Sequence, residues 1–151
     1  MTRYEIISQI KKYFKITELV CPHVFEKHGE RAWKFLATIY LHTLLVLRRD
    51  ILKVPLVCNT KVLTQRGLRC NLCEIVKAKT EDKIVYLSAH HLGIGGDLSS
   101  PEMTAEEMRQ KIEENQDLLP YPIRIEKDVN WLHIDCYDDI DDNNKITYFN
   151  P

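Results

Sequence analysis

Residues 88–97 read S-A-H-H-L-G-I-G-G-D and constrain the fold of this chain more than any other stretch. Imidazole and carboxylate groups are common zinc ligands, and a catalytic zinc usually takes three of them. Gly93, Gly95 and Gly96 allow the backbone to turn and to approach a metal closely. A second polar segment, W-L-H-I-D at residues 131–135, holds a further histidine. The chain is therefore expected to fold so that these two segments meet around one Zn²⁺ ion.

Each of these residues also has a simpler interpretation. A lone histidine is more often a surface or hydrogen-bonded core residue than a ligand, and Asp97 could merely cap a turn. Spacing alone does not choose between His90 and His91. The glycines do not match a phosphate-binding loop, because the pattern fits neither the dinucleotide nor the P-loop signature and no lysine follows.

Length and composition predict one globular domain over residues 1–151, with 44% hydrophobic and 28% charged residues. The formal net charge of −1 argues against a nucleic-acid or membrane-surface partner. No apolar run approaches the length of a bilayer span. The N-terminus enters an amphipathic pattern at once and does not resemble a signal peptide, so synthesis in a bacterial cytoplasm is expected.

The cysteines number five, an odd count that predicts reduced thiols. Cys70 and Cys73 form a CxxC pair, which can bind a structural zinc or act as a redox pair. No second pair lies at zinc-finger spacing, so small, partly buried thiols are favoured. His23, beside Cys21, is interpreted as a polar group that anchors a loop.

Helices are expected to come first in the chain. Thr2 and Glu5 form a capping box that starts the first one. An apolar stripe then predicts a long helix over residues 29–52. A short helical pattern covers residues 72–76 and a charged surface loop residues 77–83. A second capping box at Thr104 starts a helix that runs to about residue 115.

The strands are expected mainly in the second half. Short apolar runs predict strands at residues 55–59 and 84–87. Residues 121–125 and 129–136 should pair as a hairpin, and residues 145–149 should return as an edge strand. The acidic segment 138–144 is interpreted as a solvated loop and not a calcium site, because it lacks the EF-hand glycine and closing glutamate. Together these elements predict an α+β fold whose mainly antiparallel sheet carries the polar residues.

Taken together, these two polar segments resemble the motifs of the zinc D-Ala-D-Ala carboxypeptidases, which share the hedgehog/DD-peptidase fold. Residues 88–97 are similar to the family signature S-x-H-x-x-G-x-A-x-D, with Gly95 in place of the alanine. Residues 131–135 resemble its second motif, H-x-D after an apolar pair. Residues 66–70, R-G-L-R-C, resemble its S-G-Y-R segment. The resemblance runs from about Tyr13 to Asp135, and its N-terminal part is similar to short carboxypeptidase-like proteins of phages and gut bacteria.

The resemblance implies a role for several residues. It selects His90 over His91 and gives His90, Asp97 and His133 as zinc ligands. Arg69 would bind the substrate carboxylate or the developing oxyanion, and Ser88 would support the site. The implied reaction is hydrolysis of a peptide bond in a peptidoglycan stem peptide or cross-link.

The general base is the point where the chain departs from the family. Many family members have a glutamate or aspartate where this chain has Asn130, and an amide cannot take a proton at neutral pH. Asp128 is expected first as the base and Glu126 second, although strand alternation would turn both away from His133 unless a bulge or the hairpin turn re-aims them. Asp135 shares the face of His133 and is expected to orient His133 or His90, with a role as the base as its less favoured alternative.

Two functions follow from this pattern. The favoured one is a zinc metallopeptidase that acts on the cell wall, for example an endolysin released during phage infection. The alternative is a zinc-stabilised, catalytically silent binding or virion module of the same fold, whose partners would be other phage proteins. The ligand set and Arg69 favour the enzyme, and Asn130 favours the silent module.

Overall fold

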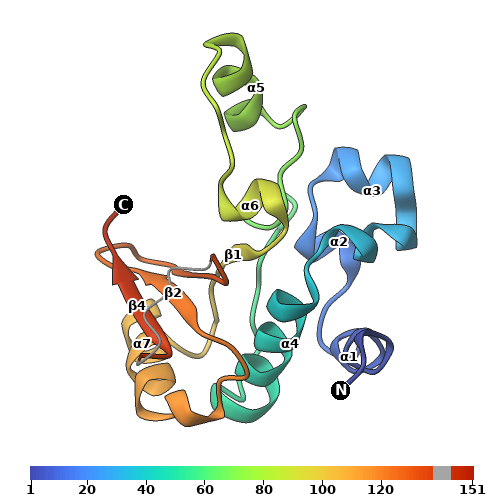
Figure 1. The fold of residues 1–151 in the computed structure, drawn as a ribbon. Helices are drawn as coiled ribbons and strands as arrows, with labels where there is room; N and C mark the ends of the chain where they lie inside the picture. The colour runs from blue at the N-terminus through green and yellow to red at the C-terminus, as the bar shows by residue number, and fades with distance from the viewer. Residues whose placement is uncertain (138–143) are drawn as a thin grey trace.

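The computed structural model describes residues 1–137 and 144–151, so most of the acidic segment 138–144 lies outside the described residues. Its first half is helical (Figure 1). The elements there are α1 (Arg3–Ile10), α2 (Ile16–Leu19), α3 (Pro22–His28), the 3₁₀ helix η1 (Gly29–Phe35), α4 (Thr38–Val46) and the π-helical turn η2 (Leu47–Ile51).

The second half carries the sheet. Its elements are α5 (Glu74–Glu81), α6 (Ala89–Leu92), β1 (Gly95–Leu98), α7 (Ala105–Glu114), the 3₁₀ helix η3 (Gln116–Leu118), β2 (Ile123–Glu126), β3 (Leu132–Asp135) and β4 (Ile146–Phe149). The strand order is β1-β3-β2-β4. β3 pairs antiparallel with β1 and β2, whereas β4 pairs parallel with β2. The α+β class is therefore confirmed, as are the β2–β3 pairing and an edge strand at the C-terminus.

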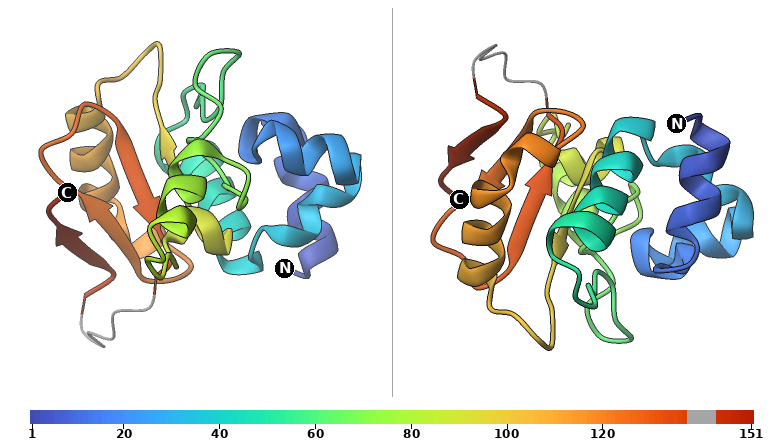
Figure 2. Two further views of the ribbon diagram at one scale, coloured as in Figure 1. Left: turned by 90° about the horizontal axis from the view of Figure 1, so that it is seen from above. Right: turned by 90° about the horizontal axis from the view of Figure 1, so that it is seen from below.

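The sheet and the N-terminal helices lie at opposite ends of the molecule, with α4 between them (Figure 2). A cluster of buried apolar side chains continues through all three parts, from Ile6 on α1 through Leu44 on α4 to Ile134 on β3. Side chains at alternate positions of β3 point to opposite faces of the sheet. Ile134 packs into this core, so the side chains of His133 and Asp135 point to the opposite face of the sheet.

Both predicted capping boxes are present. The Thr2 hydroxyl accepts a hydrogen bond from the Glu5 backbone N–H, and the Glu5 carboxylate accepts one from the Thr2 backbone N–H. Thr104 and Glu107 make the same reciprocal pair at the start of α7. These contacts satisfy N–H groups that have no partner inside the helix, which fixes where each helix begins.

The single helix predicted over residues 29–52 is wrong, because the chain is extended at Leu36 and Ala37. Contacts from distant residues satisfy the backbone groups at this break. The Arg3 guanidinium donates to the carbonyl oxygens of Trp33 and Leu36 at 2.8 and 2.9 Å. The Ala37 N–H donates to the Gly93 carbonyl at 2.9 Å. A local apolar stripe does not reveal such contacts.

Three shorter predictions are also wrong. The segment 55–59 forms only an isolated bridge, Val57 to Ser99. The supposed surface loop 77–83 is largely the second half of α5. Residues 84–87 are not a strand, and three of their apolar side chains are exposed: Ile84, Val85 and Leu87. Figure 1 shows α5 at the end of an excursion away from the rest of the fold, where these residues have no strand to pair with. Among the described residues, no helix is long and apolar enough to cross a bilayer.

Candidate metal centre

Three side chains that can bind a metal converge on one face of the sheet. They are His90 from α6, Asp97 from β1 and His133 from β3, and their ligand atoms lie within 4.8 Å of one another. Asp97 and His133 are register partners across β1 and β3. Side chains of such partners point to the same face of an antiparallel sheet. The strand pairing itself therefore brings the carboxylate and the second imidazole together.

α6 supplies the first imidazole. The Ser88 hydroxyl accepts a hydrogen bond from the His91 N–H and caps this short helix. Gly93 ends it with φ +68°, a left-handed conformation that favours glycine. The chain then turns directly into β1 (Figure 1). Ser88 and Gly93 thus position His90 without contacting a metal.

His90 and His91 point to different partners. The Nδ1 of His90 lies 2.9 Å from the Gly67 carbonyl oxygen and donates its proton there, which leaves Nε2 free to face Asp97. The Nδ1 of His91 instead lies 3.2 Å from the Arg69 carbonyl. The structure therefore places His90 in the cluster and His91 outside it.

His133 is held between two carboxylates. Its Nδ1 lies 2.7 Å from Asp97 Oδ1, and its Nε2 lies 3.0 Å from Asp135 Oδ2. Asp135 in turn accepts hydrogen bonds from Arg124 Nε and Nη2 at 2.9 and 3.0 Å. Asp135 therefore shares the face of His133 and is hydrogen-bonded to it, and its role in orienting a zinc ligand stays a prediction. Sequence reasoning missed Arg124, although an arginine between two apolar residues of a predicted strand was a usable signal.

The electrostatics of the cluster favour charged groups. Burial by itself would raise the pKa of Asp97, but hydrogen bonds with His133 and His90 outweigh it and hold that pKa well below its usual range. Burial would lower the pKa of His133, but its hydrogen bonds with Asp135 and Asp97 raise it to about 9. Without a metal, His133 is therefore an imidazolium that donates to both carboxylates.

The donor set fits a zinc ion. Zn–N bonds of about 2.0 Å and Zn–O bonds of about 2.1 Å at tetrahedral angles separate nitrogen and oxygen by about 3.3 Å. His90 Nε2 and Asp97 Oδ1 are 3.4 Å apart. The 2.7 Å between His133 Nδ1 and Asp97 Oδ1 is a hydrogen-bond length, so a metal would replace the shared proton and separate the two atoms slightly. Three ligands leave a fourth position for water or substrate, as in catalytic zinc sites.

Arg69 lies beside this cluster. Its Nη2 is 3.7 Å from Asp97 Oδ2, and its side chain is largely buried. The Gln65 carbonyl accepts a hydrogen bond from Arg69 Nε, and Nη1 donates to the Tyr86 hydroxyl at 3.1 Å. The guanidinium is thus held in place next to the ligands, where it can bind an anionic group.

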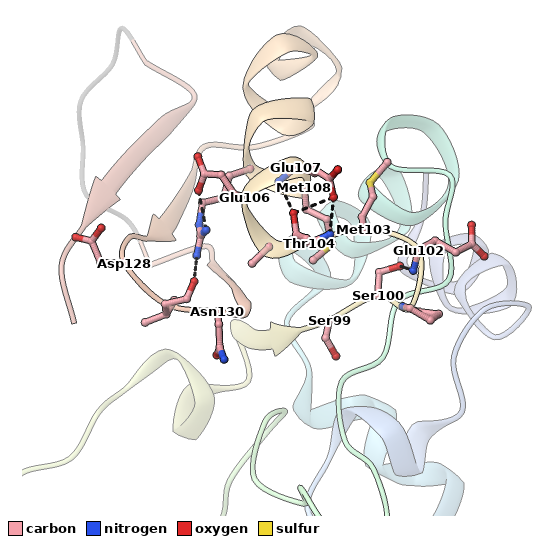
Figure 3. A pocket seen from close by; sticks show the side chains of 14 residues that line it. Ser99, Ser100, Glu102, Met103, Thr104, Glu106, Glu107, Met108, Asp128 and Asn130 are labelled. Atoms are coloured by element: carbon pink, nitrogen blue, oxygen red, sulfur yellow. Dashed lines mark hydrogen bonds and ion pairs between the residues drawn. The ribbon is translucent and has the colours of Figure 1, made fainter.

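Asp128, the acid expected first as the general base, lies on the surface. Asp128 is exposed, has φ +58° and lines a groove of about 740 Å³ beneath α7 together with Asn130. In Figure 3, Asp128 lies beside β4 and points away from Asn130, whose amide points toward α6. The structure therefore does not bring Asp128 toward the metal ligands.

Glu126 lies on the correct face of the sheet. It follows Arg124 by two residues on β2, and Arg124 contacts Asp135. Its register partner on β4 is Phe149, whose ring packs edge-on against His133 with centroids 5.6 Å apart. A regular strand would turn Glu126 away from His133, but the turn between β2 and β3 re-aims it, because the register between these two strands sets its face.

The cysteine prediction needs correction. All five thiols are free, but three of them are not isolated. Cys21, Cys70 and Cys73 gather with His23, and the ligand atoms of these four residues lie within 4.8 Å of one another, a separation compatible with a metal site. His23 therefore faces sulfur atoms and is not simply a loop anchor.

Comparisons of the chain with models of known families, with curated proteins and with solved structures gave no match. The chemistry of the two clusters therefore rests on their own side chains.

Proposed function

We propose that the chain is a zinc metallopeptidase of the hedgehog/DD-peptidase type that hydrolyses peptide bonds in peptidoglycan stem peptides or cross-links. One observation carries this proposal. Two imidazoles and a carboxylate from three separate elements meet within 4.8 Å, with a guanidinium 3.7 Å from the carboxylate. The residues that supply these groups stand in the order and spacing of the family motifs that they resemble.

His90, Asp97 and His133 would hold the zinc. When bound, zinc polarises a peptide carbonyl and lowers the pKa of a coordinated water. The protein supplies the orientation: the Gly67 carbonyl fixes His90, and Asp135 fixes His133. Partners of this kind also raise the basicity of the imidazole ligand.

Arg69 would bind the substrate. Its guanidinium can form charge-assisted hydrogen bonds with the terminal carboxylate of a stem peptide or with the carbonyl oxygen as it gains negative charge. The contacts with Gln65 and Tyr86 hold it in place before substrate arrives. Such preorganisation is what makes a donor effective in the transition state.

Glu126 is the acid that we assign as general base. It shares the sheet face of His133, whereas Asp128 is exposed beside α7, so the order expected from the sequence is reversed. Glu126 would take the proton of the attacking water and pass it to the leaving amine. Asn130 cannot do so, although its amide points toward α6, which carries His90 (Figure 3).

The experiment is digestion of purified peptidoglycan by the zinc-loaded chain, with mass spectrometry of new amino and carboxyl termini. Cleavage is expected from the wild type and not from His133→Ala. Glu126→Gln should lose most of the rate and keep its zinc, and Asp128→Asn is the matched control that should retain activity. Equal losses in the two variants would contradict the assignment of Glu126.

The silent module is the second candidate, and Asn130 is the observation that favours it. It predicts that the wild type binds zinc but cleaves nothing, whereas Asn130→Glu gains cleavage. That pair of results would replace the enzyme by a zinc-stabilised binding module.

A further inference from the structure

We propose that Cys21, His23, Cys70 and Cys73 bind a second zinc ion, which is structural. This site is separate from the cluster of His90, Asp97 and His133, and it does not depend on whether that cluster is catalytic. Cys3His is one of the ligand sets of closed, four-coordinate structural zinc sites.

Distances within the cluster fit zinc coordination. The Nδ1 of His23 lies 3.7 Å from Cys70 Sγ and 3.8 Å from Cys73 Sγ. Zn–S bonds of about 2.3 Å and Zn–N bonds of about 2.0 Å at tetrahedral angles place sulfur and nitrogen about 3.5 Å apart. The observed pairs are therefore already close to the separations that one shared ion requires.

The local backbone also suits zinc ligands. Cys70 and Cys73 are separated by two residues, the spacing of the CxxC pairs found in zinc sites. The Leu72 N–H lies 3.4 Å from Cys70 Sγ and donates to it, and the Cys73 N–H donates to the Cys70 carbonyl at 3.0 Å. Hydrogen bonds to a ligand sulfur stabilise its thiolate form.

The thiols of this cluster would bind a metal as thiolates. Three thiolates whose sulfur atoms lie within 4.8 Å of one another need a positive charge at their centre. Zinc supplies that charge and displaces the thiol protons, so binding releases protons. His23 is exposed and Cys70 is partly exposed, which gives the ion access to the cluster.

The zinc would join two distant parts of the chain. Cys21 is the N-cap of α3, and His23 lies in its first turn, whereas Cys73 is the N-cap of α5. Between the two parts, the Cys21 N–H donates to the Leu68 carbonyl at 2.9 Å. The ion would therefore fix the loop before α5 to the N-terminal helices.

The test is zinc analysis of the purified full chain together with cobalt substitution. The wild type should hold two zinc ions per chain. The double variant His90→Ala/His133→Ala should keep one, and its cobalt form should show thiolate-to-cobalt charge-transfer absorption in the near ultraviolet. Cys70→Ser should lose that absorption and one zinc, and Cys58→Ala, a buried thiol outside the cluster, should lose neither.

His23→Cys covers the case in which Cys70→Ser does not fold. It offers four sulfur ligands, so it should keep both zinc ions and strengthen the charge-transfer absorption. The proposal is overturned if the folded His90→Ala/His133→Ala variant holds no zinc, or if His23→Cys leaves the cobalt spectrum unchanged. Iron with inorganic sulfide in place of zinc would also overturn it. If only the histidine–aspartate cluster fails to bind zinc, the wild type holds one zinc ion per chain and shows the charge-transfer absorption in its cobalt form, and Cys70→Ser holds none.

Discussion

Asp135→Asn is the sharpest test of how the histidine–aspartate cluster is built. The Asp135 carboxylate is 1% exposed and accepts hydrogen bonds from His133, Arg124 and the Tyr137 N–H. Asparagine has nearly the same shape, but it carries no charge and can accept at only one of its two terminal atoms. The substitution therefore weakens the hydrogen bonds that His133 and Arg124 make with residue 135, with little change in packing.

Two magnitudes follow from these contacts. Removing one partner of a buried ion pair costs about 3–5 kcal/mol. The Arg124 side chain is 22% exposed and can be hydrated, so a loss at the lower end of this range, about 3 kcal/mol, is expected. In a chain of this length, that loss lowers the unfolding midpoint of the metal-free protein by about 6–12 °C. Loss of a partner that orients a histidine ligand weakens zinc binding by about 10–100-fold.

Asp50→Asn is the matched control. Arg49 binds Asp50 through the same two atoms, Nε and Nη2, at 2.8 and 2.7 Å, but both side chains are 36% exposed and the pair is not hydrogen-bonded to a histidine. Exposed ion pairs contribute less than about 1 kcal/mol. Zinc affinity is measured by competition with a chromogenic chelator, and stability by urea unfolding after chelation.

The outcomes separate the two roles of Asp135. If stability falls but zinc affinity stays at the wild-type value, Asp135 does not orient His133. If Asp135→Asn is no more destabilising than Asp50→Asn, the assigned strength of the buried pair is wrong.

Other perturbations test the surrounding structure. Gly95→Ala should lower stability by about 1–3 kcal/mol in urea unfolding, because its Cβ would lie 2.5 Å from the Cβ of Asp135; wild-type stability would contradict the close pairing of β1 and β3. Arg3→Met should cost about 2 kcal/mol, since the carbonyls of Trp33 and Leu36 lose a charged donor, and an unchanged midpoint would show that the break before α4 does not need it. Removal of zinc by a chelator should lower the unfolding temperature, because an ion that binds only the folded chain stabilises it; re-addition of zinc should restore the midpoint.

The histidine–aspartate cluster could be predicted because its information is local. His90 and Asp97 lie in one short segment, and His133 lies in the second polar segment; the strand β1, whose pairing with β3 brings the two segments together, was not predicted. The motifs name the residue types, and the strand register brings them together. What the motifs do not contain is the outer support from Arg124, since its partner Asp135 lies on another strand.

The cysteine cluster could not be predicted for the opposite reason. Its two halves are separated by almost fifty residues, and neither the CxxC pair nor the segment of Cys21 and His23 has a partner pair at zinc-finger spacing. Only the pairing of Val20 with Leu68 brings Cys21 next to Cys70. A search for zinc-finger spacing fails here because the ligands come from two loops that meet through the tertiary fold.

The segment at residues 66–70 explains why the two clusters occur in one small fold. The Arg66 carbonyl accepts from the Asp97 N–H at 2.8 Å, and the Gly67 carbonyl orients His90. Arg69, two residues further on, faces Asp97, and the next residue is a cysteine of the second cluster. The proposed catalytic role needs these groups to be held rigidly. A structural zinc at one end of the segment and the sheet at the other would supply that rigidity, and in that case the second site would support the first.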